Sequence, residues 1–305
     1  SPFETFLRSL EQEYQPIGKI KIADPILEGY EAANFKLETD KGQYVLKIFE
    51  ANRQMENIDS LIKVLVEAPK IGVPVPALVQ GANGDLSTFT DGDKKIFYYI
   101  TELFRGENFE HKVPSLEEIK IVTTHLAALN TLDFPVVEAY DSWGNKNLVQ
   151  EFEKNTIKLS PTERQFVEPI VNNMRDIDLQ RFSKGVIHGD MQRKHVIKSD
   201  SGAYCIIDFG CMSNDAKIID LSVYLAWFCL SKENRSQWGN IQQSVLEEYT
   251  KKHHLLESEV RALPVLIRAS YATYFMTTSI LIRQGDKSGE TKQWNINAKE
   301  MLLSF

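Results

Sequence analysis

The stretch that decides the predicted fold, residues 186–210, reads VIHGDMQRKHVIKSDSGAYCIIDFG. Each of its two main apolar runs leads to a carboxylate, at Asp190 after a glycine and at Asp208 before Phe-Gly. Between them, residues 195–207 have the pattern of a β-hairpin with a polar turn at 199–202. Two carboxylates at the ends of neighbouring buried strands can hold a divalent cation and accept a proton, the two tasks that phosphoryl transfer requires. A simple turn and a strand-end cap would use the same residues, so the pattern alone leaves that structural alternative open.

The composition is that of an ordinary globular chain. Its 305 residues are 43% hydrophobic and 25% charged, enough for one large two-lobed domain or two small ones. The net charge of −7 argues against a nucleic-acid partner and weakly favours a cationic substrate. The three cysteines have no CxxC spacing and indicate a reduced, cytoplasmic protein. We expect no membrane partner, because neither an apolar stretch of spanning length nor a signal peptide is visible, and the sequence leaves the oligomeric state undetermined.

The first hundred residues combine helices with strands. Apolar residues at helical spacing predict helices over 3–14 and 58–66. Strands are predicted at 34–39, 43–49, 77–80, 86–89 and 95–102, the first two joined by a turn at 40–42. Lys47 lies in an apolar strand, which is costly unless the ammonium group meets an anion. It either faces water on an edge strand or, given the two downstream carboxylates, contacts nucleotide phosphates.

The remainder is predicted to be mainly helical. Ser115 is expected to cap a helix whose apolar face runs from Ile119 to Leu132. Residues 136–184 read as a loop with one or two helices, and further helices are expected over 215–230 and, fully buried, over 265–282.

The motifs HGD and IIDFG within 186–210 resemble the catalytic core of the kinase-like small-molecule phosphotransferases, which include aminoglycoside phosphotransferases, choline kinases and type II homoserine kinases. This resemblance implies an α+β, bilobal, protein-kinase-like fold. A small antiparallel-sheet lobe would bind the nucleotide over 1–104, and a larger, mostly helical lobe would carry catalysis and substrate binding over 105–305. The likeness is greatest to type II homoserine kinases, mainly in residues 28–49, 186–227 and 262–268.

The resemblance also implies which residues bind ATP. Lys47 and the loop containing Gly29 and Asn34 would contact the phosphates, and backbone groups from Glu102 to Phe104 would contact adenine. The helix that usually supplies a glutamate to the strand lysine has Leu61 near the matching position. Glu56 and Asp59 are the nearest acidic residues, so the partner of Lys47 on this helix stays unassigned.

The same resemblance implies the catalytic groups. Asp190 would accept the proton of a substrate hydroxyl, and Arg193 would steady phosphate charge or a substrate carboxylate. Asp208 would hold Mg²⁺ together with His195, and Asp220 would brace the catalytic loop. His195 replaces the asparagine usual in the family, so it is a metal ligand that admits Mn²⁺ as well, a structural hydrogen-bonding group, or a sign of lost activity.

The resulting hypothesis is an ATP-dependent kinase acting on a hydroxyl group of a small molecule, with homoserine or a related amino acid or amino alcohol as the best candidate. The alternatives are an aminoglycoside- or choline-type kinase and a nucleotide-binding pseudokinase. Three aromatic residues, Trp227, Tyr271 and Tyr274, could surround a quaternary amine, although aromatics at helical spacing are also typical of a core.

Overall fold

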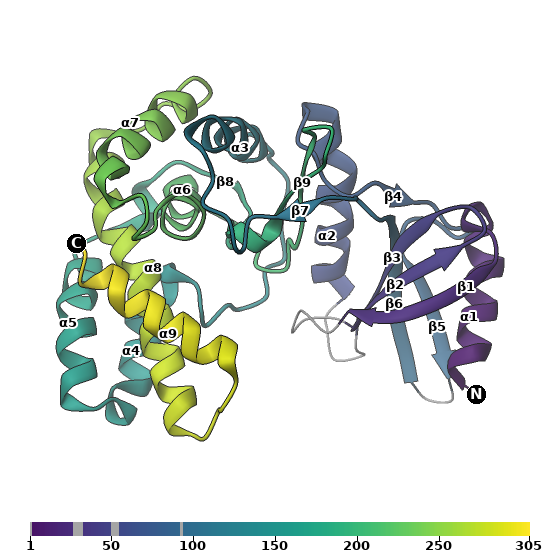
Figure 1. Cartoon of the computed structure of the whole chain (residues 1–305), viewed down its shortest axis with the longest axis horizontal. Helices are drawn as coiled ribbons and strands as arrows, with labels where there is room; N and C mark the ends of the chain where they lie inside the picture. Colours follow the sequence, from purple (N-terminus) through teal and green to yellow (C-terminus); the bar gives the residue numbers. More distant parts are fainter. Residues whose placement is uncertain (1, 27–32, 50–54, 92–93) are drawn as a thin grey trace. The chain divides into compact units, whose positions relative to one another are not determined.

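The computed structural model describes residues 2–26, 33–49, 55–91 and 94–305 (Figure 1). The chain forms two compact units. The first unit contains Ser1–Glu107 and Ile197–Gly210, and the second contains Asn108–Val196 and Cys211–Phe305.

The first unit is built on an antiparallel sheet with the strand order β1-β2-β3-β6-β4, in which β5 also pairs with β6. Its strands are β1 Ile20–Ile26, β2 Ala33–Thr39, β3 Gln43–Phe49, β4 Leu78–Val79, β5 Ser87–Asp91 and β6 Lys94–Glu102. The predicted hairpin at 34–49 is confirmed, since β2 and β3 pair from Ala33↔Ile48 to Glu38↔Gln43.

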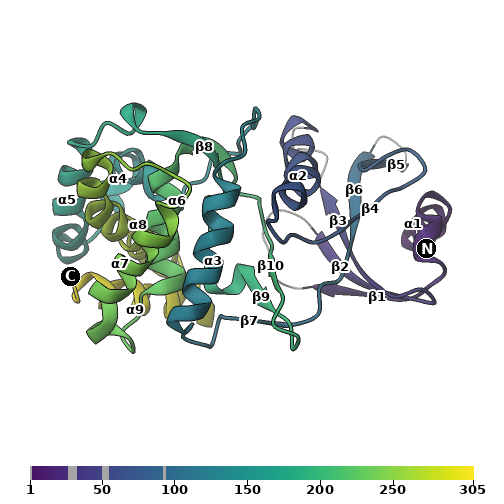
Figure 2. The ribbon, with the colours of Figure 1, turned by 90° about the horizontal axis from the view of Figure 1, so that it is seen from above.

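Two helices flank this sheet, α1 Pro2–Glu13 and α2 Met55–Glu67 (Figure 2). Both were predicted. The apolar face of α1 is buried at Phe6 and Leu10, which pack in one cluster with Leu46 of β3 and Ile100 of β6. This core fixes β3 and therefore the position of Lys47 within the unit.

A second small sheet, with the order β10-β9-β7, is made of β7 Glu107–Asn108, β9 Val196–Lys198 and β10 Tyr204–Ile206. The predicted hairpin is present, with Gly202 at a φ of 85° in its turn. His195 does not begin the strand as expected. It ends a single 3₁₀ turn, Arg193–His195, because its N–H donates to the Gln192 carbonyl at 3.1 Å.

The second unit is mostly helical. Its helices are α3 Leu116–Leu129, α4 Leu148–Asn155, α5 Pro161–Arg175, α6 Lys217–Tyr224, α7 Trp238–Tyr249, α8 Glu257–Arg283 and α9 Gly289–Leu302. Within the described parts of the chain, single 3₁₀ turns are Gln15–Ile17, Ala68–Ile71, Asn145–Asn147, Thr156–Lys158, Leu179–Arg181, Arg193–His195 and Arg235–Gln237. Ser115 forms the predicted capping box with Glu118 at the start of α3.

Helix α8 is the centre of the second unit and packs against α5, α6 and α9. By length and composition it could cross a membrane, contrary to the expectation that no stretch reaches spanning length. However, 72% of its apolar window is buried inside the protein, as expected for the predicted core helix.

The helix predicted over 215–230 is present from Lys217 to Cys229, but it begins two residues late and its last turn is not α-helical. Residues 213–216 form β11 (Ser213–Ala216), which pairs with β8 (Lys184–Ile187). The last turn, Leu225–Cys229, is π-helical. Its backbone carbonyls are taken by side chains, since the Tyr271 hydroxyl donates to Ala226 at 2.6 Å and Arg193 Nε donates to Phe228 at 3.0 Å.

Candidate active site

In the first unit, Lys47 and Asp208 lie close together. Lys47 Nζ is 3.9 Å from Asp208 Oδ1, and the Lys47 side chain is 16% exposed against 39% for Asp208. Among the described residues, Asp208 is the one non-glycine residue with a positive φ, 64°. This left-handed conformation costs a non-glycine residue about 1–2 kcal/mol, and such strain is concentrated at functional sites. The strand end therefore presents a half-exposed carboxylate beside a largely buried ammonium group.

The other residues expected to bind nucleotide are distributed along the same sheet. Asn34 in β2 lies opposite Lys47 in the strand register. Gly29 lies outside the described residues, as does the side chain of Glu56, and Asp59 is exposed on α2. The nucleotide-binding roles of Asn34 and Gly29 stay predictions, and the acidic residue expected on α2 stays unassigned.

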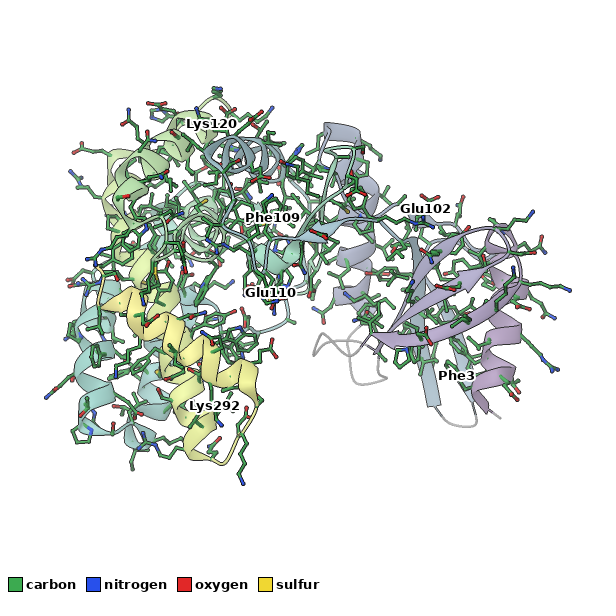
Figure 3. All side chains as sticks on the ribbon, viewed as in Figure 1. Phe3, Glu102, Phe109, Glu110, Lys120 and Lys292 are labelled. Atoms are coloured by element: carbon green, nitrogen blue, oxygen red, sulfur yellow. The ribbon has the colours of Figure 1, made fainter. Side chains whose placement is uncertain are left out.

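Glu102, labelled in Figure 3, ends β6 and is followed by the half-buried Phe104. The Glu102 N–H donates to the Ala77 carbonyl at 2.8 Å, and the Leu103 N–H donates to the Gln43 carbonyl at 3.0 Å. These two donors belong to the sheet, so adenine would have to use other backbone groups between residues 102 and 104.

In the second unit, the loop His188-Gly-Asp190 is held by the fully buried Asp220 of α6. Its two oxygens accept from the backbone N–H groups of His188 at 2.9 Å and Gly189 at 3.0 Å, and from Asn130 Nδ2 at 2.8 Å. Burial raises the pKa of Asp220, against the effect of His188 and of these donors, which favour the carboxylate. The prediction that Asp220 braces the loop is confirmed.

Gly189 is required at the tight point of this loop. Its φ is 81°, and a Cβ there would lie 2.3 Å from the Cys211 carbonyl oxygen. Any larger residue would push the loop away from Cys211. Asp190, the next residue, has a side chain that is 22% exposed and accessible to a small molecule.

His195 is tied to the backbone of the same loop. Its Nδ1 lies 2.7 Å from the Asp190 carbonyl oxygen, so Nδ1 carries the proton and donates it. This contact accounts for a structural role. It also agrees with metal binding through Nε2, since metal-bound histidines commonly donate the other ring N–H to a carbonyl.

Gln192 is a site residue that the sequence reasoning missed. This buried side chain donates from Nε2 to Asp190 Oδ1 and to the Tyr274 hydroxyl of α8. Tyr274 lies 82 positions further along the chain, so no local signal connects the two residues. Burial, followed by Asp190 and Asp141, raises the pKa of Tyr274 well above its ordinary value, so the phenol keeps its proton.

Arg193 does not point its Nε at an open surface. Nε donates to the Phe228 carbonyl, and Nη2 is buried with no hydrogen-bond partner among the described residues. Burial lowers the pKa of this guanidinium group. The geometry gives Arg193 a structural contact with the π-helical turn, and its predicted contact with phosphate or a substrate carboxylate stays a prediction.

Tyr274 and the three tryptophans around it, Trp143, Trp227 and Trp294, form what we call the aromatic wall. The Tyr274 ring centroid lies 4.4 Å from Trp227, 5.0 Å from Trp143 and 5.9 Å from Trp294. The three tryptophans are half-buried. Lys194 Nζ lies 5.1 Å from the centroid of Trp294. Trp227 and Tyr274, two of the three aromatics that could surround an amine, belong to this wall. The third, Tyr271, is buried with its ring centroid 5.1 Å from that of Trp227, and a role of the three in binding an amine stays a prediction.

The residues present fit a divalent cation bound with a nucleotide. No group of three or more His, Cys, Asp or Glu side chains in the described parts of the chain could hold a metal ion by itself. Asp208 nevertheless offers a half-exposed carboxylate beside Lys47. Mg²⁺ in phosphotransferases is typically bound by one or two protein carboxylates and completed by substrate phosphates.

Known proteins with a similar sequence or fold agree with these features. A homoserine kinase from Agrobacterium fabrum is 23% identical over 280 residues, which cover 90% of this chain and 84% of that protein. An amicoumacin kinase solved with AMP-PNP and Ca²⁺ superposes with a TM-score of 0.73 at 12% identity, covering 98% of this chain and 92% of that one. A microcompartment-associated aminopropanol kinase superposes with a TM-score of 0.65 at 16% identity, covering 97% and 95%.

These neighbours confirm the predicted α+β fold of the protein-kinase-like type. The model of the phosphotransferase enzyme family matches residues 23–251, which include Lys47, Asp190 and Asp208. The chain belongs to this family of phosphotransferases and is a small-molecule kinase.

Proposed function

We propose that the protein transfers the γ-phosphoryl group of ATP to a hydroxyl group of a small, amine-bearing molecule, with homoserine or a related amino acid or amino alcohol as the best candidate. The observation that carries the proposal is the partly exposed Asp190 carboxylate, on a loop whose backbone N–H groups are bound by the buried Asp220. A base must be held still and remain accessible to act on a hydroxyl group. The relatives named homoserine kinase support the choice of acceptor.

In this proposal Asp190 hydrogen-bonds the acceptor hydroxyl and takes its proton as the oxygen attacks the γ-phosphorus. The bond from the γ-phosphorus to the bridging oxygen breaks, and ADP leaves. Lys47 binds phosphate oxygens, and Asp208 and His195 are the candidate ligands for Mg²⁺ or Mn²⁺. When bound, the cation offsets the negative charge of the phosphates.

A second candidate acceptor is a quaternary or multiply charged amine, as in choline-type and aminoglycoside kinases. The aromatic wall favours it, because the face of an aromatic ring attracts a cation within about 6 Å of its centroid. We further propose a cytoplasmic location, because Cys205 and Cys229 are buried thiols of the kind kept in reducing compartments.

The test is a panel of acceptors read by ADP release: L-homoserine, 1-amino-2-propanol, choline and kanamycin. Wild type should release ADP with an L-amino acid or amino alcohol at least tenfold faster than with water. Asp190→Ala should abolish this difference while still binding an ATP analogue in calorimetry. Binding of the analogue without ADP release for any acceptor would indicate a pseudokinase and refute the proposal.

A further inference from the structure

Gln192 connects Asp190 to the aromatic wall through one amide group. Its Nε2 donates to Asp190 Oδ1 and also to the Tyr274 hydroxyl, 2.5 Å away. A primary amide nitrogen has two protons, and both are used here. The reversed amide would place its oxygen against the Asp190 carboxylate, so the carboxylate fixes which way the amide points.

The contact also distinguishes the two oxygens of Asp190. Oδ1 receives the Gln192 proton, whereas Oδ2 lies 3.5 Å from His195 Nδ1. That nitrogen already donates its proton to the Asp190 carbonyl at 2.7 Å. Oδ2 therefore keeps the greater capacity to accept a proton from an incoming hydroxyl group.

Tyr274 in turn is held in place by packing. It lies in the middle of the buried helix α8, and its side chain is only 8% exposed. The half-buried rings of Trp143, Trp227 and Trp294 surround it. An aromatic side chain in such contacts has one conformation, so its hydroxyl oxygen is a fixed acceptor for Gln192.

We propose that Gln192 is a positioning residue for phosphoryl transfer, which orients the Asp190 carboxylate and is itself oriented by Tyr274. The inference rests on the proposed function, because it assigns the base role to Asp190. The hydrogen bonds of Gln192 connect the base to the aromatic wall, so an acceptor that lies against the wall meets Asp190 Oδ2 in a defined direction. A displacement of about 1 Å in such a group can lower the rate about 10²-fold.

The experiment compares four variants with wild type, using the acceptor of the panel that wild type phosphorylates fastest. Gln192→Met keeps the volume and removes both hydrogen bonds. Tyr274→Phe removes only the hydroxyl group. Tyr271→Phe is the matched control, since Tyr271 is also buried on α8 and also contacts Trp227, but its hydroxyl donates to the Ala226 carbonyl. The fourth variant combines Gln192→Met with Tyr274→Phe.

We expect Gln192→Met to lower kcat about 30- to 100-fold with KM for ATP within about twofold of wild type. Tyr274→Phe should lower kcat about 3- to 10-fold, and Tyr271→Phe less than twofold. The double variant should be no slower than Gln192→Met, because Tyr274 acts through Gln192. A role limited to packing would lower kcat equally in the two tyrosine variants, because both side chains are buried on α8 and contact Trp227.

Several results would overturn the inference: a normal kcat in Gln192→Met, additive losses in the double variant, or equal losses in the two tyrosine variants. If Gln192→Met does not melt cooperatively, Gln192→Asn is measured in its place. The shorter side chain of this variant withdraws the amide group from Asp190 by one carbon, so it must show the same loss of kcat. If wild type bound the ATP analogue but phosphorylated no acceptor, the proposed function itself would fail and this inference with it. A failure of the inference alone leaves wild-type turnover intact.

Discussion

Replacing Asp220 with asparagine should destabilise the loop at residues 188–190 by an amount that follows from the three hydrogen bonds of the Asp220 carboxylate. Oδ2 accepts from Asn130 and the His188 N–H, and Oδ1 accepts from the Gly189 N–H. The new amide can keep its oxygen at the Oδ2 position, but its NH₂ group then faces the Gly189 N–H. One buried donor left without an acceptor costs about 1–3 kcal/mol, and two weakened bonds lose about 0.5 kcal/mol each. We therefore expect a loss of about 2–4 kcal/mol, or about 3–6 °C in Tm for a chain of 305 residues.

The measurement is hydrogen exchange at the His188 and Gly189 amides together with thermal melting. Exchange at Gly189 should accelerate more than exchange at His188, because Gly189 loses its acceptor entirely. Asp200→Asn, in the exposed hairpin turn, is the control and should change neither quantity. Unchanged exchange at Gly189, or a Tm equal to that of the control, would refute the assignment of Asp220 as the group that holds the loop.

Three further predictions concern the nucleotide, the metal and pH. Asp208→Asn should weaken binding of the metal–ATP analogue complex at least tenfold in calorimetry. Tm should stay within about 2 °C of wild type, because the half-exposed carboxylate contributes little to folding. A normal affinity would exclude Asp208 as a metal ligand. His195→Asn should raise the ratio of activity in Mg²⁺ to activity in Mn²⁺ if His195 binds the metal, and an equal ratio in both proteins would leave it a structural role. Burial raises the pKa of Tyr14 to about 12 from an ordinary value of 10.0, so the stability that its neutral phenol provides is complete below pH 10 and is lost as pH rises toward 12. Between pH 10 and 12 the Tm of Tyr14→Phe should therefore fall less than the Tm of wild type. An equal fall in the two proteins would contradict this.

Local sequence signals were sufficient wherever a feature depends on neighbouring residues. The turn at 40–42 predicted the β2–β3 hairpin, and Ser115 with Glu118 predicted the start of α3. The buried character of α8 followed from its apolar composition. Each of these features depends on residues that are near one another in the sequence.

The π-helical turn and strand β11 were missed for the opposite reason. Residues 215–230 contain a continuous helical pattern, but the carbonyls of the turn are taken by Arg193 and Tyr271, which lie far away in the sequence. Asp215 lies in β11, which pairs with β8, and its carboxylate forms an ion pair with Lys146 at 2.8 Å. Long-range hydrogen bonds of this kind override local propensity.

The site shows the same division between local and long-range information. Asp190 and Asp208 could be picked out because each follows an apolar run within a short motif. Gln192 could not, because its importance depends on Tyr274 and on the rings around it. His195 lies between the two cases. Its position in the motif suggested a metal ligand, whereas the structure adds a hydrogen bond from Nδ1 to the Asp190 carbonyl. Replacing His195 therefore removes a support of the Asp190 backbone, whatever the metal experiment shows.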